Sequence, residues 1–342
     1  MANSMKNKLF KIGKKFVGRG KKVFIIAEVG VNHEGNFEKC IKLLEKVKFS
    51  GADAVKLQTI NPNYNYVRGT KSYKEFKDTD FSDEDYLKLK KFAKKLGLAF
   101  FSTPGSFSEV DRIAKLRFEA IKISSGLLTN YPLINYASKK GLPLIISTGM
   151  ALKAEIKKAL NSTGSNQNVA ILKCTSLYPA PDKSLNISSI RELKRIFNTL
   201  VGYSDHTLDD LSCLSAVSNG AKIIEKHFTL NKNRKGKDHK ISLEPQKFKD
   251  MVDKIRRIEI MMGENKIQPS NQELKNRRIF HRCLVAGNTI YKNEKFTSEN
   301  LALKRLRPKQ SGMKPEFYNR VLGKTSKKKI IKDSPIKLLH IK

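Results

Sequence analysis

The 342-residue sequence has no tryptophan, few cysteines, and fewer than half as many acidic residues as basic ones. The cysteines show no paired spacing, which excludes a zinc ribbon and a disulfide framework and is typical of a reducing compartment. No apolar run approaches the roughly 18 residues that a membrane span needs, and no signal peptide is evident. We therefore expect a cytoplasmic protein with no membrane segment. The cysteines are Cys40, Cys174, Cys213 and Cys283.

The charge balance is strongly positive, with 68 basic residues against 32 acidic ones and a formal net charge of +36. Such an excess raises nucleic acid or an anionic membrane as a partner. The lysines are spread over every expected helix and both termini, however, and no recognition helix or RNA-binding signature accompanies them. We expect no specific nucleic-acid partner, only salt-sensitive, non-specific binding to polyanions and attraction of anionic substrates.

The order of elements predicts the fold. After a basic arm at residues 1–22, short apolar strands alternate with amphipathic helical stretches, which is typical of parallel βα units. About eight such units over residues 23–263 predict a (β/α)8 barrel; an open doubly wound sheet is the alternative, but no Gly-rich dinucleotide motif follows the first strand. The expected strands are Val23–Glu28, Asp53–Gln58, Ala99–Thr103, Ala120–Ser124, Leu142–Ser147, Val169–Cys174, Leu200–Tyr203 and Lys222–Lys226, before a closing helix at Pro245–Met262.

A second, smaller domain follows the barrel. Residues 264–275 are polar and include Pro269, as in a linker. Residues 276–342 are rich in turn-forming residues and contain three short apolar segments, which predict a small β-rich domain. The expected strands are Cys283–Ala286, Leu301–Leu303 and Pro335–Ile341.

Polar residues end nearly every expected barrel strand. Since reactive groups lie at the carboxyl ends of barrel strands, these residues should converge. Alternation places Lys56 and Gln58 on one face of their strand, and Lys122 and Ser124 on one face of theirs. Ammonium groups beside hydroxyls suit a ligand that carries both phosphate and carboxylate, so we expect a small, multiply charged acid. The neighbouring hydroxyls belong to Thr103, Ser125, Ser147 and Ser204.

Two histidines predict a metal site. His206 and His227 end adjacent expected strands, where two imidazoles can approach one ion and leave positions open for water or substrate. Asp205 and Glu225 stand next to them as expected orienting groups. Nitrogen and oxygen ligands with open positions suit a divalent ion that acts as a Lewis acid on a carbonyl: manganese first, with magnesium or cobalt as alternatives.

Motifs along nearly the whole chain resemble the sialic acid synthase family, which joins phosphoenolpyruvate to N-acetylmannosamine or a related sugar. The resemblance implies a phosphoenolpyruvate-dependent, carbon–carbon bond-forming enzyme with a TIM barrel and a C-terminal antifreeze-protein-like (SAF) domain. It also implies a domain-swapped homodimer, in which the SAF domain with Arg307-Pro308 reaches over the partner's active site. The motifs are Phe10–Gly13, Ile25–Gly35, Gly51–Thr59, Ser147–Met150, Gly202–Thr207, Ile224–Thr229, Asp238–His239 and Ser242–Pro245.

The resemblance also implies roles for individual residues. The enol C3 would add to the open-chain aldehyde, water would attack C2, and the intermediate would lose phosphate, with Glu28 positioning or deprotonating the water. Glu28, Lys56 and Gln58 would face the reacting carbons, and His206 and His227 would hold the metal. Phosphoenolpyruvate would be bound by Thr103, Lys122, Ser125, Ser147 and Ser204, and the sugar by Tyr178, Asp238 and Arg307 of the neighbouring chain.

One position departs from the family pattern. The family usually has an acidic residue directly after the Ser-Gly of the fourth strand, where this chain has Leu127, so a family proton donor is absent. The segment Asn61–Lys77, which covers the substrate in the family, does not align, and the sugar is not fixed by the sequence. Two other interpretations stay open: a legionaminic- or pseudaminic-type synthase that uses a di-N-acetylated trideoxy hexose, and a barrel that binds ligand without turnover.

Overall fold

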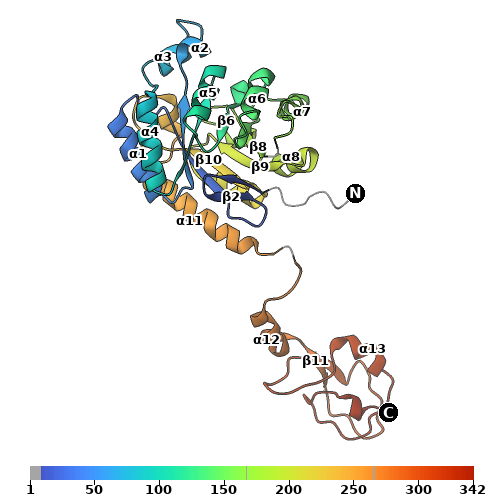
Figure 1. The fold of residues 1–342 in the computed structure, drawn as a ribbon. Coiled ribbons are helices and arrows are strands. Elements are labelled where there is room, and N and C mark those ends of the chain that lie inside the picture. Colours follow the sequence, from blue (N-terminus) through green and yellow to red (C-terminus); the bar gives the residue numbers. More distant parts are fainter. Residues whose placement is uncertain (1–8, 167, 265) are drawn as a thin grey trace. The chain divides into compact units, whose positions relative to one another are not determined.

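The structure of the protein is a computed structural model that describes residues 9–166, 168–264 and 266–342. Residues 1–8 of the expected basic arm lie outside the described residues. The chain divides into two compact units, Met1–Gly263 and Glu264–Lys342 (Figure 1). No helix in the described ranges is both long enough and apolar enough to cross a bilayer.

Eight parallel strands close into a barrel in the first unit, in which the last strand, β10, pairs with the first, β3. The closed barrel confirms the predicted (β/α)8 architecture. Every strand is buried or nearly so along its length, because helices cover its outer face and side chains fill the interior. The strands are β3 (Phe24–Gly30), β4 (Ala54–Thr59), β5 (Ala99–Pro104), β6 (Ile121–Ile123), β7 (Leu144–Ser147), β8 (Val169–Cys174), β9 (Leu200–Asp205) and β10 (Ile223–His227).

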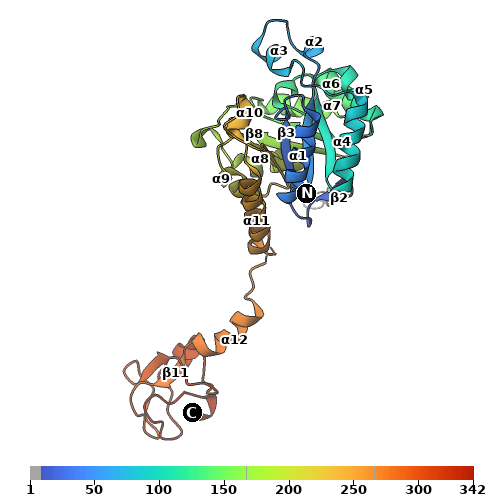
Figure 2. The ribbon, with the colours of Figure 1, turned by 90° about the vertical axis from the view of Figure 1, so that its left-hand side faces the viewer.

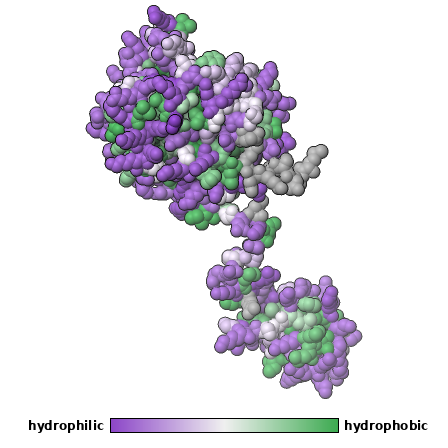
Figure 3. Space-filling view, viewed as in Figure 1, coloured by the Kyte–Doolittle hydropathy of each residue, from purple (hydrophilic) through white to green (hydrophobic). Residues whose placement is uncertain are grey.

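Amphipathic helices surround the barrel. In α1, for example, Asn36 accepts a hydrogen bond from the Lys39 N–H at the N-terminus, and four apolar side chains face the strands. The outer faces carry the lysines, so the face of the first unit seen in Figure 3 is mostly hydrophilic. The helices are α1 (Phe37–Phe49), α4 (Asp83–Lys95), α5 (Phe107–Lys115), α6 (Tyr131–Ser138), α7 (Lys153–Ser162), α8 (Ser189–Phe197), α9 (Leu211–Ser218) and α11 (Pro245–Met262), with a 3-10 turn at Asp182–Ser184.

A β-hairpin lies within the segment that the sequence suggested to be a basic arm. Its strands are β1 (Leu9–Ile12) and β2 (Lys15–Gly18). Phe10, Ile12 and Val17 are buried in the main core. Gly13 turns the chain with φ +56°, and a Cβ there would lie 3.3 Å from Cβ of Ala99, the first residue of β5. The hairpin therefore packs against the amino end of the barrel, away from the predicted site.

Short helices extend from the opposite end of the barrel. After β4, the chain forms α2 (Pro62–Asn65) and α3 (Lys71–Phe76), which stand out beyond the barrel in Figure 2. After β10 it forms α10 (Lys237–Ile241) before α11. The 3-10 turn Ser125–Leu127 follows β6 and contains Leu127. These segments follow the carboxyl ends of the strands and form the rim of the site.

The second unit has its own small core. The strands β11 (Cys283–Ala286) and β12 (Leu301–Lys304) pair antiparallel, as predicted. The predicted strand Pro335–Ile341 is wrong for its central part, because Leu338–His340 forms a 3-10 turn and Pro335 makes only an isolated bridge with Val285. The unit also contains α12 (Asn271–Phe280), the 3-10 turn Pro315–Phe317 and α13 (Tyr318–Val321).

Candidate active site at the carboxyl end of the barrel

Two lysines and two carboxylates meet inside the mouth of the barrel, all at most 5% exposed. Lys56 Nζ lies 2.7 Å from Glu28 Oε2 and 4.0 Å from Glu225 Oε2. Lys122 Nζ lies 3.7 Å from Glu225 Oε1, too far for a direct hydrogen bond. Four buried charges stay together here only because each faces the opposite sign.

Burial and charge shift the pKa values of this cluster in different directions. Burial raises the pKa of Glu28 to about 7, against the opposing effect of Lys56. Burial alone would raise the pKa of Glu225, but the positive charges of Lys122 and Lys56 outweigh the effect of burial. The pKa of Glu225 is therefore lowered. Desolvation lowers the pKa of Lys122. Burial opposes the charge on Lys56 as well, but Glu225 and Glu28 prevail and raise its pKa.

Hydroxyl groups surround the lysines as the sequence predicted. Lys56 Nζ donates to Thr103 Oγ1 at 2.9 Å, and Lys122 Nζ donates to Ser147 Oγ at 2.7 Å. Ser204 Oγ donates to Glu225 Oε1 at 3.0 Å. The structure thus brings together, on neighbouring strands, the lysines and hydroxyls that the sequence placed at the strand ends.

A second polar wall includes a residue that the sequence reasoning missed. Ser125 Oγ accepts from the Gly149 N–H at 3.1 Å. A Cβ on Gly149 would lie 2.2 Å from Ser176 Oγ and 2.7 Å from Ser125 Oγ, so a larger residue here would displace both hydroxyls. Ser176 Oγ is buried and has no hydrogen-bond partner among the described residues. Its position two residues after the end of β8 is the signal that could have revealed it.

The two predicted metal-binding histidines are neighbours. The ring centroids of His206 and His227 are 5.5 Å apart, and Tyr178 stacks on His206 at 4.1 Å. His206 Nδ1 lies 2.7 Å from the Thr175 carbonyl oxygen, which fixes the ring with Nδ1 as donor and Nε2 as the free lone pair. His227 Nδ1 is buried without a hydrogen-bond partner among the described residues, and Asp238 Oδ2 is 3.8 Å away.

This arrangement fits a divalent ion held by two imidazoles. Rings that share one ion through nitrogens at about 2.1 Å have centres roughly 5 Å apart. Within the described chain, no group of three or more His, Cys, Asp and Glu side chains has a metal-binding arrangement. Water or substrate would therefore supply the remaining ligands.

Asp205 does not orient the histidines, in contrast to the expectation from sequence. Its carboxylate forms a fully buried ion pair with Lys226 and accepts from Thr207, Ser212 and Tyr203. Because side chains alternate along β9, Asp205 points to the face opposite Ser204. It therefore stabilises the packing between the strands and the surrounding helices. The Thr175 carbonyl takes the orienting position beside His206.

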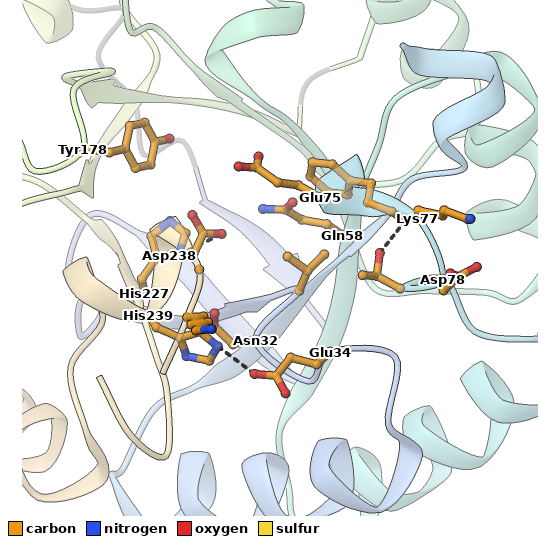
Figure 4. A pocket seen from close by; sticks show the side chains of 15 residues that line it. Asn32, Glu34, Gln58, Glu75, Lys77, Asp78, Tyr178, His227, Asp238 and His239 are labelled. Atoms are coloured by element: carbon orange, nitrogen blue, oxygen red, sulfur yellow. Dashed lines mark hydrogen bonds and ion pairs between the residues drawn. The ribbon is translucent and has the colours of Figure 1, made fainter. Parts of the chain in front are cut away.

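A cavity of about 510 Å³ opens beside His227 (Figure 4). Gln58, Tyr178, His227 and Asp238 line it, among the predicted site residues. Gln58 Nε2 donates to Glu28 Oε1 at 2.8 Å, which links the cavity to the buried cluster. The other lining residues come from the segments after β3, β4 and β10: Val31, Asn32, Glu34, Glu75, Phe76, Lys77, Asp78, Thr79, Lys235, Gly236 and His239.

An ion-pair network at the rim of the cavity was not predicted. Arg234 Nη2 lies 2.6 Å from Glu34 Oε2, and Lys39 Nζ lies 2.8 Å from Glu34 Oε1. The hydrogen bond from Arg234 and the charge of Lys39 lower the pKa of Glu34 to about 2, although partial burial opposes this shift. His239 Nε2 lies 3.2 Å from Glu34 Oε1, so the network ties the segment around α10 to the end of β3.

Most of the predicted site residues are not among those that line this cavity: Glu28, Lys56, Thr103, Lys122, Ser125, Ser147, Ser204 and His206. Arg307 belongs to the second unit, where its side chain is exposed and its N–H donates to Gln310 Oε1 at 3.1 Å. Leu127 is half-buried and packs against the main core.

Comparisons with known proteins identify the family of the chain. Residues 43–267 match the NeuB family, and residues 281–342 match the SAF domain, which confirms the predicted small domain. An N,N'-diacetyllegionaminic acid synthase of Campylobacter jejuni is 40% identical over 93% of this chain and 99% of its own length. A pseudaminic acid synthase of the same organism is 35% identical over 91% of this chain and 94% of its own length.

A solved structure gives the same result. The N-acetylneuraminic acid (sialic acid) synthetase of Leptospira borgpetersenii, in complex with citrate, is 30% identical, with a TM-score of 0.76 over 80% of this chain and 98% of that chain. The family resemblance that the sequence motifs indicated is confirmed, and the chain belongs to the NeuB family.

Proposed function

We propose that the protein condenses phosphoenolpyruvate with the open-chain form of an N-acetylated amino sugar, releasing phosphate and forming a nine-carbon acidic sugar. The observation that carries this proposal is the buried cluster of Lys56 and Lys122 with surrounding hydroxyls. Glu225 of this cluster is on the same strand, β10, as His227 of the His206–His227 pair. Such a cluster suits an anion with a phosphate and a carboxylate, and the histidines suit an ion next to a carbonyl.

Phosphoenolpyruvate would bind inside the barrel. The Lys122 ammonium has no carboxylate within hydrogen-bond distance among the described residues, so it remains available for the phosphate, with hydroxyl donors beside it. Lys56 and Thr103 would take the carboxylate. The phosphate would also meet Ser125, Ser147 and Ser204 and the wall around Gly149.

The metal would be held by His206 and His227. A divalent ion at this position supplies Lewis-acid polarisation of the sugar carbonyl. The chain contributes the orientation, because the Thr175 carbonyl keeps the lone pair on His206 Nε2. Manganese is the ion that we propose, with magnesium and cobalt as the alternatives for direct comparison.

Glu28 would accept the proton of the attacking water. C3 of phosphoenolpyruvate forms the new bond to the aldehyde carbon, whose oxygen takes up one proton and becomes a hydroxyl. Water then adds to C2 and gives one proton to Glu28, the C2–O bond to phosphate breaks, and the other water proton leaves as C2 becomes a ketone. The two water protons balance the proton taken up by the new hydroxyl and the proton carried by the released hydrogenphosphate. Glu28 Oε1 is held by Gln58, Oε2 lies against Lys56, and a pKa of about 7 lets the carboxylate accept the water proton near neutral pH.

The sugar that we propose is a di-N-acetylated trideoxy hexose of the legionaminic type. Support comes from the 40% identity to the N,N'-diacetyllegionaminic acid synthase over 99% of that protein. N-acetylmannosamine is the second candidate, which the likeness to the sialic acid synthetase favours. Tyr178 and Asp238 would contact the sugar from the cavity wall, and Arg307 would contact the acetamido group from a neighbouring chain in a domain-swapped homodimer.

A phosphate-release assay tests the proposal. Purified protein would be incubated with phosphoenolpyruvate, manganese and each of three sugars: N-acetylmannosamine and two di-N-acetylated trideoxy hexoses that differ in configuration. We expect release that requires both substrates and stops with a chelator. Binding of phosphoenolpyruvate without release for any sugar would favour the ligand-binding barrel instead.

A further inference from the structure

The chain between β4 and α4 forms one wall of the cavity. We call residues 61–80 the cover segment, which contains α2 and α3. Its residues Glu75, Phe76 and Lys77 line the cavity. Figure 4 draws Glu75 and Lys77 on the side opposite His239. The cover segment buries little of itself: no residue of α2 or α3 is buried. Something outside these two helices must therefore hold them in place.

The start of the cover segment is held by one buried carboxylate. Glu109 of α5, only 4% exposed, accepts the Asn61 N–H at 2.6 Å and Asn65 Nδ2 at 2.9 Å, both at Oε1. Its other oxygen accepts the N–H groups of Gly105 at 2.5 Å and Ser106 at 2.8 Å. A single side chain thus ties the cover segment to the turn after β5.

The end of the cover segment is held from the same helix. Arg112, three residues after Glu109, donates from Nη1 to Asp80 Oδ2 at 2.7 Å and from Nε to Asp83 Oδ1 at 2.6 Å. Its Nη2 donates to the Phe81 carbonyl. Residues three apart lie on one face of a helix. Glu109 and Arg112, one turn apart on α5, therefore hold both ends of the cover segment by hydrogen bonds and ion pairs.

Two glycines permit the close contact. A Cβ on Gly105 would lie 1.9 Å from Asn65 Oδ1, and a Cβ on Gly35 would lie 2.2 Å from the Asp78 carbonyl oxygen. Gly35 also has φ +71°. Neither site accepts a larger residue without movement of the cover segment.

We propose that Glu109 and Arg112 are positioning residues that hold the cover segment closed over the cavity and thereby set the affinity for the sugar. The identity of the bound molecule as a sugar rests on the proposed function. Neither side chain is among the residues that line the cavity, so both act through the cover segment. The proposed phosphoenolpyruvate contacts lie on the strands, so phosphoenolpyruvate affinity should depend little on Arg112.

Arg112→Lys tests the grip on the end of the cover segment, because lysine keeps the charge but loses the planar fork that reaches two carboxylates and a carbonyl. We expect KM for the sugar to rise about tenfold, with kcat and the affinity for phosphoenolpyruvate within about twofold. Lys115→Ala is the matched control: Lys115 is on the same helix and pairs with Asp83 at 3.1 Å, but its side chain is 77% exposed. It should leave all constants unchanged.

A double-mutant cycle tests the start of the cover segment. Gly105→Ala should raise KM for the sugar in the natural chain, because the new methyl group displaces Asn65. In an Asn65→Ala background the same change has nothing to displace, so it should have little further effect. Additive effects of the two substitutions would contradict the proposal, as would Gly105→Ala without any effect.

Hydrogen exchange separates this proposal from the proposed function. Exchange of residues 62–77 in the protein without sugar should be faster in Arg112→Lys and unchanged in Lys115→Ala. If the natural chain turns over no sugar, the proposed function fails. The exchange measurement still shows whether Arg112 holds the cover segment in place. Unchanged exchange in Arg112→Lys, or equal loss of affinity for both substrates, would overturn it.

Discussion

Lys56 and Glu28 form an ion pair with 2.7 Å between Nζ and Oε2, and their side chains are only 3% and 2% exposed. Two charges so deeply buried are costly to desolvate, so the pair contributes less to stability than its short distance suggests. The pair instead fixes the positions of both groups. Lys56 lies where the proposed reaction needs a cation for the carboxylate of phosphoenolpyruvate, and Glu28 lies where it needs a base for the water.

Lys56→Met tests this relationship. The change leaves the Glu28 and Glu225 carboxylates with one cation fewer, so we expect a loss of about 3 kcal/mol in unfolding free energy and no phosphate release. Adding Glu28→Gln should restore part of the stability but no activity. Lys88→Met, which removes an exposed pair with Glu84, is the control and should leave stability essentially unchanged. Urea unfolding of the four proteins distinguishes these outcomes.

The barrel and its polar mouth could be predicted because both depend on local patterns of apolar and polar residues in the sequence. Apolar runs of strand length alternate with helical stretches; Lys56 and Lys122 lie within such runs, and His227 ends one. Strand ends converge in any closed barrel, so the lysines and histidines had to meet once the fold was known.

Other features depend on contacts between distant residues, which the sequence does not reveal. Glu109 and Asn61 are 48 positions apart, and no local sequence pattern around either residue predicts their hydrogen bond. The same holds for Asp205 and Lys226, whose pairing depends on the register between β9 and β10. The hairpin of β1 and β2 was hidden because its buried residues stand among lysines, which obscure the alternation.

His206→Ala and His227→Ala test the metal site. Each should lower manganese affinity by at least about tenfold and abolish phosphate release, with an unchanged circular dichroism spectrum. Isothermal titration with manganese alone, without substrate, supplies a readout that is independent of turnover. His281→Ala, at an exposed position in the second unit, is the control. Full manganese binding in both site variants would remove these residues from the proposed metal site.

Arg307→Ala tests the contribution of the second unit. If Arg307 holds the acetamido group, sugar affinity should fall by about tenfold while phosphoenolpyruvate affinity stays within about twofold. Separate titrations of the two substrates measure this difference. Lys309→Ala removes a neighbouring cation and should affect neither, apart from a small change with ionic strength. Equal weakening of both substrates by Arg307→Ala would contradict a role at the sugar.

Gly149→Ala tests the wall of the proposed phosphate site. The added Cβ would lie 2.2 Å from Ser176 Oγ and 2.7 Å from Ser125 Oγ, so both hydroxyls must move. We expect KM for phosphoenolpyruvate to rise by about tenfold or more, with a smaller effect on sugar affinity. Gly126→Ala, next to the same wall, is the control, since a Cβ there meets nothing within 4 Å. Equal kinetics in the natural chain and Gly149→Ala would place the phosphate elsewhere.

His33 makes stability depend on pH. Its ring is buried against Phe81 at a centroid distance of 4.5 Å, and Nδ1 accepts from the Gly35 N–H at 3.1 Å. Burial and the charge of Lys39 lower the pKa of His33 from 6.5 to about 4. A lowered pKa means that the unfolded chain takes up the proton first, so the stabilisation is complete above pH 6.5 and is lost as the pH falls towards 4.

The expected size is about 3 kcal/mol between these limits, because each pKa unit corresponds to roughly 1.4 kcal/mol. Other groups titrate in the same range, so the test is the difference between two proteins rather than one curve. His33→Asn keeps an acceptor for the Gly35 N–H but cannot take up a proton, so its unfolding free energy should fall less steeply from pH 7 to pH 4.5. His281→Asn should keep the natural slope. Parallel curves for His33→Asn and the natural chain would show that His33 carries no proton-linked stability.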